Sequence, residues 1–237
     1  MILSELTTGI LKNFSSINSG IVLKPGQNQT TWCSNHAIYA MAWFAESIPV
    51  ECGIFDLRTL TQALSAFDIV PDVQFGEKAV IVKSGVQKIK YVYCNPVVID
   101  QQYKRYTDLK FDDEAATIFS ISKEDFIRLR KVASFMSLPN VVVQYDGDQL
   151  QFVATDVGSS SSNQTVITID QAQIRTTPGA PFCFAFEAER LHKLCESGYT
   201  VHIVDGARKY GRFVHTEFPL TYTIAASAEK NLVPILD

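Results

Sequence analysis

The sequence predicts an α+β protein made of two similar halves, each with two helices packed on antiparallel strands. Three observations lead to this prediction. A short motif occurs twice, four segments carry apolar residues at helical spacing, and the segments between them alternate like strands. The chain has 237 residues, of which 46% are hydrophobic and 19% are charged, so it can bury a sizeable core.

The repeated motif reads Cys-x-x-Phe-acid-x-x-x-Leu and occurs at residues 52–60 and again at residues 183–191. Each copy follows a short strand-like run and opens a predicted helix. The acidic residues are Asp56 and Glu187, and both fall in the N-terminal turn of their helix. A negative charge at that position complements the helix dipole, so the two copies predict the same local structure.

A second pair of segments precedes the first pair. Residues 10–17 and residues 128–135 are both helix-like, and each leads into an apolar strand and a glycine-containing turn. The copies lie 131 residues apart in the first pair and 118 in the second, which indicates that the halves differ by insertions in loops. Because the order of elements also occurs twice, an internal duplication is favoured over chance.

A polar segment separates the two halves. Residues 95–114 show neither helical nor strand periodicity, which is typical of a linker. We therefore expect an N-terminal domain over residues 1–103, a linker over residues 104–116 and a C-terminal domain over residues 117–237.

The four helices are expected at about residues 3–17, 57–67, 122–136 and 187–197. Each of these segments has one apolar stripe and an opposite face that carries at least one cation. The cations on the outer faces and their flanks are Lys12, Arg58, Arg128, Arg130, Lys131, Arg190 and Lys193. Acidic residues share these faces, so an ordinary solvated surface is the alternative interpretation.

The usual motifs of nucleotide binding and catalysis are missing from the sequence. It contains neither a Gly-rich phosphate loop, nor a Gly-x-Ser-x-Gly elbow, nor a His-Glu-x-x-His metal motif. Cys33-Ser-Asn-His36 could begin a metal site, but it is not followed by a second Cys/His pair with zinc-ligand spacing. We therefore expect a structural histidine and a buried thiol at this motif, and a protein that is not an enzyme and needs neither metal nor cofactor.

Charge and cysteine usage restrict the environment of the protein. Lys and Arg number 21 against 25 Asp and Glu, and the net charge of −4 argues, as an average, against a nucleic-acid binder. An average does not show where the charges lie. Five cysteines without a Cys-x-x-Cys pair fit free thiols in a reducing compartment. The apolar run at residues 37–45 is far shorter than a membrane span, and the N-terminus lacks the pattern of a secretory leader.

Residues 3–27 carry a specific resemblance. They read LSELTTGILKNFSSINSGIVLKPGQ, which closely resembles the opening of the sliding clamps of T-even-type bacteriophages. The most specific part is Leu-Lys-Asn-Phe-x-x-Ile-Asn-Ser-Gly-Ile. The resemblance continues more weakly over residues 48–57 and resumes at residues 121–129 and 213–228. It therefore extends over both halves of the chain.

This resemblance implies the DNA-clamp fold, in which a two-domain subunit closes head to tail into a ring of three subunits. Helices would line the hole, sheets would form the outside, and duplex DNA would pass through without sequence preference. The family tethers the replicative DNA polymerase as a processivity factor and also takes part in late transcription. An ATP-driven clamp loader opens and closes the ring. Such a protein acts in the cytoplasm of the infected bacterial host.

Two sets of residues are expected to make these contacts. The residues expected to face DNA are Lys12, Arg58, Arg128, Arg130, Lys131, Arg190 and Lys193. The family also places a pocket for short apolar peptides of partner proteins near the linker and the second domain. The candidates for this pocket are Val97, Val98, Tyr103, Tyr106, Val233, Ile235 and Leu236.

Two other functions stay open at this point. The chain could be a phage structural or interaction protein that uses the same duplicated fold without encircling DNA. It could also be an enzyme with a scattered site that includes Cys33 and His36. The oligomeric state of the purified chain is the observation that best separates the clamp from both alternatives.

Overall fold

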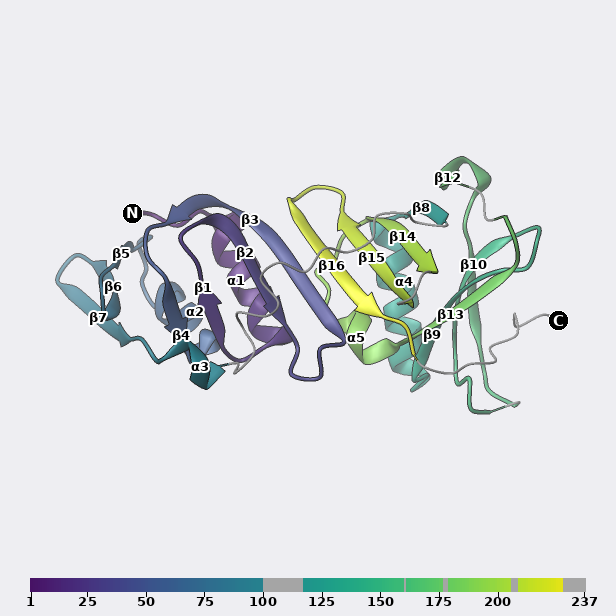
Figure 1. Ribbon diagram of the computed structural model, residues 1–237, viewed down its shortest axis with the longest axis horizontal. Coiled ribbons are helices and arrows are strands. Elements are labelled where there is room, and N and C mark those ends of the chain that lie inside the picture. Colours follow the sequence, from purple (N-terminus) through teal and green to yellow (C-terminus); the bar gives the residue numbers. More distant parts are fainter. Residues whose placement is uncertain (100–116, 160, 177–178, 206–208, 228–237) are drawn as a thin grey trace. The chain divides into compact units, whose positions relative to one another are not determined.

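The structure is a computed structural model that forms two compact units (Figure 1). Unit 1 is Met1–Lys110 and unit 2 is Phe111–Asp237. The structure describes residues 1–99, 117–159, 161–176, 179–205 and 209–227. The expected linker at residues 104–116 lies outside the described residues, so its limits stay a prediction.

Unit 1 combines helices with short antiparallel sheets. Its elements, in chain order, are α1 (Glu5–Ile17), β1 (Ile21–Leu23), β2 (Gly26–Trp32), β3 (Ile38–Ile48), β4 (Cys52–Ile54), α2 (Leu57–Ser65), β5 (Asp72–Phe75), β6 (Ala79–Ser84), β7 (Gln87–Val92) and α3 (Pro96–Ile99). Strand β1 pairs with β4, β2 pairs with β3, and β6 lies between β5 and β7, all antiparallel. The apolar run at residues 37–45 lies almost entirely in strand β3.

Helix α1 buries its apolar side in unit 1 and exposes its polar side. Its apolar stripe packs against α2 and β3, and the buried residues of that stripe include Ile10, Leu11, Phe14 and Ile17. The helix starts at Glu5 because Ser4 caps it: the Ser4 hydroxyl oxygen accepts a hydrogen bond from the amide of Thr7 at 3.2 Å. Burial of the stripe leaves the opposite side of α1, with Lys12, exposed.

Unit 2 contains larger sheets. Its elements are β8 (Thr117–Ile121), α4 (Lys123–Phe135), β9 (Asn140–Tyr145), β10 (Leu150–Thr155), β11 (Thr165–Thr168), the 3-10 turn η2 (Gln171–Gln173), β12 (Ile174–Thr176), β13 (Phe182–Glu187), α5 (Ala188–His192), β14 (Tyr199–Asp205), β15 (Lys209–His215) and β16 (Leu220–Ala225). One antiparallel ladder runs β12-β8-β14-β15-β16 and another runs β11-β10-β9-β13.

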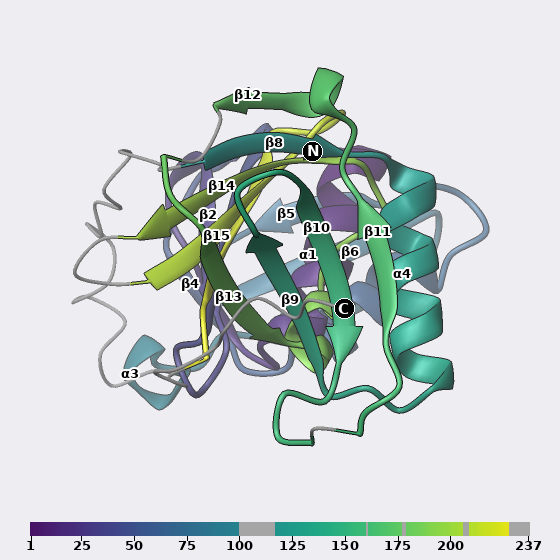
Figure 2. The ribbon, with the colours of Figure 1, turned by 90° about the vertical axis from the view of Figure 1, so that its right-hand side faces the viewer.

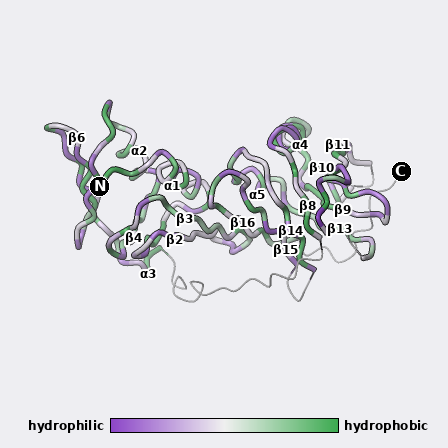
Figure 3. Tube along the Cα trace, turned by 90° about the horizontal axis from the view of Figure 1, so that it is seen from above, coloured by the Kyte–Doolittle hydropathy of each residue, from purple (hydrophilic) through white to green (hydrophobic). Residues whose placement is uncertain are grey.

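An aromatic core lies under helix α4. The Phe126 ring of α4 meets the Tyr199 ring edge-on at 4.9 Å, and Tyr199 also contacts the rings of Phe213 and Tyr222 at 6.1 and 6.2 Å. All four side chains are fully buried. Figure 2 shows α4 running beside β11, and Figure 3 shows hydrophobic and hydrophilic residues alternating along its coil. The buried ring of Phe126 thus sets which face of α4 is turned to solvent.

The first helix of each unit is capped in the same way. Ser122 stands before α4 as Ser4 stands before α1, and its hydroxyl oxygen accepts a hydrogen bond from the amide of Asp125 at 3.1 Å. Both helices are 13 residues long. Ser4 and Ser122 are separated by the same 118 residues as the second pair of sequence segments. The structure therefore confirms that these two segments are equivalent.

The second helix of each unit is also anchored in the same way. Its first amide donates to a carbonyl shortly after the first helix: Leu57 donates to Ser19 at 2.7 Å, and Ala188 donates to Pro139 at 2.8 Å. The strand before each of these helices, β4 or β13, pairs antiparallel with the strand after the first helix, β1 or β9. The two similar α+β halves predicted from the sequence are thus confirmed.

Helix α5 is shorter than the sequence predicts. The apolar spacing predicts a helix to residue 197, but α5 ends at His192 and continues only as turns in which Lys193 and Leu194 donate to the carbonyls of Arg190 and Leu191. The next amide, that of Cys195, donates to the hydroxyl oxygen of Tyr222 at 3.3 Å. Contacts from outside the helix have replaced the helical hydrogen bonds, and these contacts are not visible in the local sequence.

A buried histidine closes the hairpin between β15 and β16. The Nδ1 atom of His215 accepts hydrogen bonds from the amides of Glu217 and Phe218, both at 3.0 Å. The imidazole also lies 4.7 Å from the Phe218 ring. Burial lowers the pKa of His215 below 6.5; the charge of Glu217 opposes this shift and that of Lys123 adds to it. Folding therefore favours the neutral imidazole.

We expect the free energy of unfolding to fall as the pH drops below about 6.5, because the unfolded chain then binds a proton that folded His215 resists. Above that pH the contribution of His215 is fully present. The change His215→Gln keeps an acceptor but removes the titration of His215, so it should reduce this pH dependence in urea unfolding. An unaltered profile in His215→Gln would contradict the assignment.

In the part of the chain that the structure describes, the helices are too short or too polar to cross a membrane.

Candidate nucleic-acid interface

The most accessible of the predicted DNA-facing residues come from three helices. Lys12 lies on α1, Arg58 on α2, and Arg128 and Lys131 on α4, and all four are exposed. Arg128 forms an ion pair with Asp125, at 3.6 Å and on the surface. A surface pair of this kind contributes about 0–1 kcal/mol, so it leaves the guanidinium available to a phosphate group.

Hydroxyl groups surround Lys12 on α1. Ser15 donates its hydroxyl to the carbonyl of Lys12, and Ser16 donates to the carbonyl of Asn13, both at 2.7 Å. These hydrogen bonds turn the hydroxyl groups back to their own helix. The outer face of α1 therefore presents an isolated positive charge among small polar groups that are already hydrogen-bonded.

Arg130 has partners within unit 2. Its guanidinium donates to the carbonyls of His192 at 2.9 Å and Leu194 at 3.0 Å, and it lies 5.5 Å from the centre of the Phe126 ring. Burial lowers the pKa of this guanidinium. It thereby ties α4 to the chain at the end of α5, where carbonyls lack helical partners. A role of Arg130 in binding DNA stays a prediction.

Arg190 and Lys193 are also less accessible than the four exposed cations. The guanidinium of Arg190 is paired with Glu187 and donates to the carbonyl of Ala225 at 2.9 Å, and its side chain is only 15% exposed. Lys193 is half-buried at the end of α5. The structure thus separates the seven predicted residues into exposed cations and cations with contacts inside the fold.

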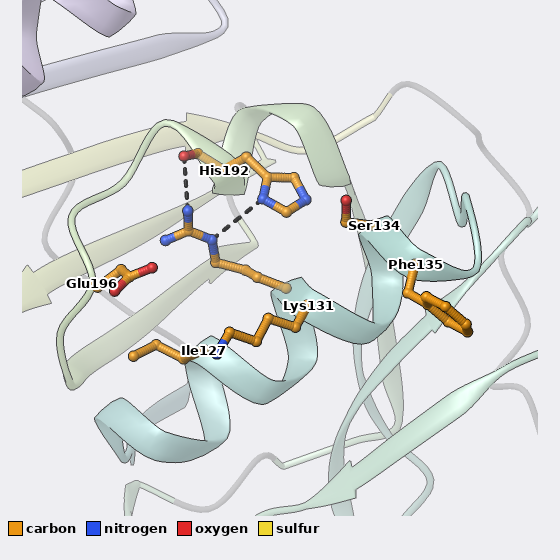
Figure 4. Close-up of a pocket in the computed structure, with 7 residues that line it drawn as sticks. Ile127, Lys131, Ser134, Phe135, His192 and Glu196 are labelled. Carbon is orange, nitrogen blue, oxygen red and sulfur yellow. Dashed lines mark hydrogen bonds between the residues drawn. The ribbon is translucent and has the colours of Figure 1, made fainter.

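A groove runs along the outer side of α4 and α5. Its volume is about 320 Å³, and it is lined by Ile127, Arg130, Lys131, Ser134, Phe135, His192 and Glu196. Figure 4 shows Glu196 and Phe135 at opposite ends of this groove. It also shows the hydrogen bonds that Arg130 donates to His192. Burial and the charge of Arg130 lower the pKa of His192, which favours a neutral imidazole here. The groove therefore combines cations with aromatic rings on the face that carries the predicted DNA contacts.

The predicted partner pocket is described only in part. Val97 and Val98 lie in the short helix α3 and are 52% and 62% exposed. The other predicted residues, Tyr103, Tyr106, Val233, Ile235 and Leu236, lie outside the described residues. The pocket stays a prediction.

The Cys33–His36 motif forms the turn between β2 and β3. The Cys33 thiol donates to Asn35 Oδ1 at 2.8 Å and accepts a hydrogen bond from the amide of Ile38 at 3.0 Å. Cys33 is buried, whereas His36 is exposed. Among the residues that the structure describes, His, Cys, Asp and Glu do not gather in any group able to hold a metal ion.

Residues 4–92 match the model of a family described as DNA polymerase processivity factor. A sliding clamp of Vibrio phage KVP40 is 28% identical over 206 residues, which are 86% of this chain and 90% of that protein. The sliding clamps of Enterobacteria phage T4 and Escherichia phage RB69 are 45% and 42% identical over 65 residues, which are 27% of this chain and 28% of each relative.

Solved structures show the same fold at low identity. The PCNA of A. fulgidus, solved with the C-terminal region of FEN-1, gives a TM-score of 0.72 at 15% identity over 97% of this chain and 98% of its own. The proliferating cellular nuclear antigen of Entamoeba histolytica gives 0.67 at 12% identity over 94% of this chain and 95% of its own. These similarities confirm the duplicated α+β fold.

Proposed function

We propose that this bacteriophage-type sliding clamp, a DNA polymerase processivity factor, closes head to tail into a ring of three copies around duplex DNA. Residues 3–27 predicted that the chain is a sliding clamp of this type, and its similarity to the sliding clamps of phages KVP40, T4 and RB69 confirms this. The observation that carries the proposal is the internal duplication. Two similar units in one chain allow three chains to supply six similar domains around a hole.

The charge distribution supports contact with DNA that ignores sequence. Attraction between lysine or arginine and phosphate is independent of sequence, whereas each good bidentate base contact discriminates by about 1–3 kcal/mol and would trap the ring. In the proposed ring Lys12, Arg58, Arg128 and Lys131 face the hole. The net charge is 0 on α1, +1 on α2 and +2 on α4, whereas the whole chain carries −4, so a positive lining is compatible with an acidic protein.

The sheet edges offer a means of joining the copies. A head-to-tail contact is heterologous and closes into a ring only if each step rotates by a suitable angle, which is 120° for three copies. Strand β7 ends the β5-β6-β7 sheet of unit 1, and β11 ends one sheet of unit 2. In the proposal an edge of unit 2 pairs with an edge of unit 1 of the next copy, because unpaired edges template such pairing.

The proposed partners follow from this topology. A closed ring leaves DNA only by opening or by sliding off an end, so an ATP-driven clamp loader is needed to place it. The ring then keeps the polymerase near its template at high effective concentration. We extend the proposal to late-transcription factors as further partners and to the cytoplasm of the infected host as the site of action.

The mass of the purified chain in solution tests the ring. Light scattering should give about three times the 26.4 kDa of one chain. A stable monomer at micromolar concentration would contradict the proposal.

Circular and linear DNA separate the clamp from a structural or interaction protein with the same fold. With polymerase and clamp loader present, the protein should remain on circular primed DNA and be lost from linear DNA, because only a topological tether is lost at a free end. Equal retention on both would favour the alternative.

A further inference from the structure

Helix α4 ends in an aromatic side chain that is exposed to solvent. Phe135 is 88% exposed, whereas Phe126 on the same helix is fully buried. Lys131 precedes Phe135 by four residues and Arg128 precedes it by seven, so the three side chains follow one face of the helix. From Arg128 to Phe135 the chain reads RLRKVASF, which contains three cations and lacks any acid.

Cations next to an exposed aromatic ring are the chemistry that binds single-stranded nucleic acid. The cations attract phosphates, and the ring offers a face on which an unpaired base can stack. Side chains four residues apart in a helix are about 5–6 Å apart, which allows one nucleotide to reach both Lys131 and Phe135. In a duplex the bases are stacked on one another, so this ring would find a base only where the strands are separated.

We propose that the end of α4 binds an unpaired nucleotide of single-stranded DNA, with its base on Phe135 and its phosphates near Lys131 and Arg128. The proposal deepens the clamp function and rests on it, because the helix face would then meet the single strand beside a primer end. The occupant is a nucleotide rather than an apolar peptide, since the residues before the ring are cationic.

The neighbouring charges limit this site to the C-terminal end of α4. Glu196 lines the same groove but lies at the end opposite Phe135 (Figure 4). Asp125 is 3.6 Å from Arg128, and it lies towards the N-terminal end of the helix. Arg130 is held by the carbonyls of His192 and Leu194. Lys131 is therefore the main phosphate contact, and the ring of Phe135 supplies the preference for an unpaired base.

The test compares binding of the full chain to labelled oligothymidylate and to a duplex of the same length, by fluorescence anisotropy. Phe135→Leu keeps an apolar side chain but removes the ring, and it should weaken binding to the single strand by about five- to tenfold, the effect of losing one base stack. Phe135→Tyr keeps the ring and should retain the affinity. Neither change should alter binding to the duplex.

The matched control is Trp43→Ala, which removes an exposed aromatic ring from strand β3, and it should not change binding to either DNA. Unchanged single-strand affinity in Phe135→Leu, or an equal loss for the duplex, would overturn the proposal. So would failure of the unaltered protein to bind oligothymidylate. These measurements need neither a clamp loader nor a closed ring, so the site can fail while the mass and circular-DNA tests still support the clamp.

Discussion

Replacing Phe126 by alanine is expected to lower the free energy of unfolding by about 3–5 kcal/mol. The Phe126 ring is fully buried and meets the Tyr199 ring at 4.9 Å, while the guanidinium of Arg130 lies 5.5 Å from its centre. Its removal leaves a cavity between α4 and β14, and the surrounding side chains can fill this cavity only in part. Urea unfolding followed by circular dichroism measures the effect.

The control for this prediction is Phe135→Ala, the same substitution on the same helix. Because the Phe135 side chain is 88% exposed, its loss should change the free energy of unfolding by no more than about 0.5 kcal/mol. Equal losses in the two variants would show that Phe126 does not anchor α4.

Replacing Lys131 by glutamate is expected to weaken the attraction of the proposed ring for duplex DNA while the ring stays intact. The change reverses one exposed charge on α4 in each copy, and therefore three charges around the proposed hole. Here K is the binding constant for DNA, and log K falls as log salt rises. Each lost phosphate contact makes this slope less steep by about 0.9, so a ring of three copies should lose nearly three from its steepness. Equilibrium binding to a labelled duplex at several salt concentrations, followed by fluorescence anisotropy, measures this slope.

Lys78→Glu is the matched control, because it makes the same charge change in the turn between β5 and β6. This lysine is exposed and lies outside the helices. It should leave the salt dependence unaltered, and light scattering should show that both variants keep the mass of the unaltered protein. If Lys78→Glu and Lys131→Glu weaken binding to the duplex equally, the contacts are not localised to the helix face.

The pairs of equivalent segments could be predicted because their signals are local. The structure adds a local signal of the same kind, because a serine hydroxyl at the N-cap, Ser4 or Ser122, accepts a hydrogen bond from the amide three residues later. The apolar spacing of residues 3–17 and 122–136 likewise predicted the buried faces of α1 and α4. Such patterns depend on neighbours within four residues, so they can be read from one chain.

The end of α5 could not be predicted in this way. Periodicity favoured a helix through Leu194 and Cys195, but the carbonyl of Leu194 binds Arg130 and the amide of Cys195 binds Tyr222. These partners are 64 and 27 residues away. Side chains from distant elements therefore decided where this helix stops.

The candidate site likewise has features that the local sequence predicts and features that depend on distant contacts. The sequence by itself determined the duplicated α+β fold, the resemblance to phage clamps and the polar faces of α1 and α4, because these depend on motifs and on helical spacing. Only the tertiary structure showed that Arg130 and Arg190 are held inside unit 2 while Lys131 and Phe135 are exposed. Helical spacing gives the side of a helix on which a side chain lies, whereas its exposure and its partners depend on what the rest of the fold packs against that side.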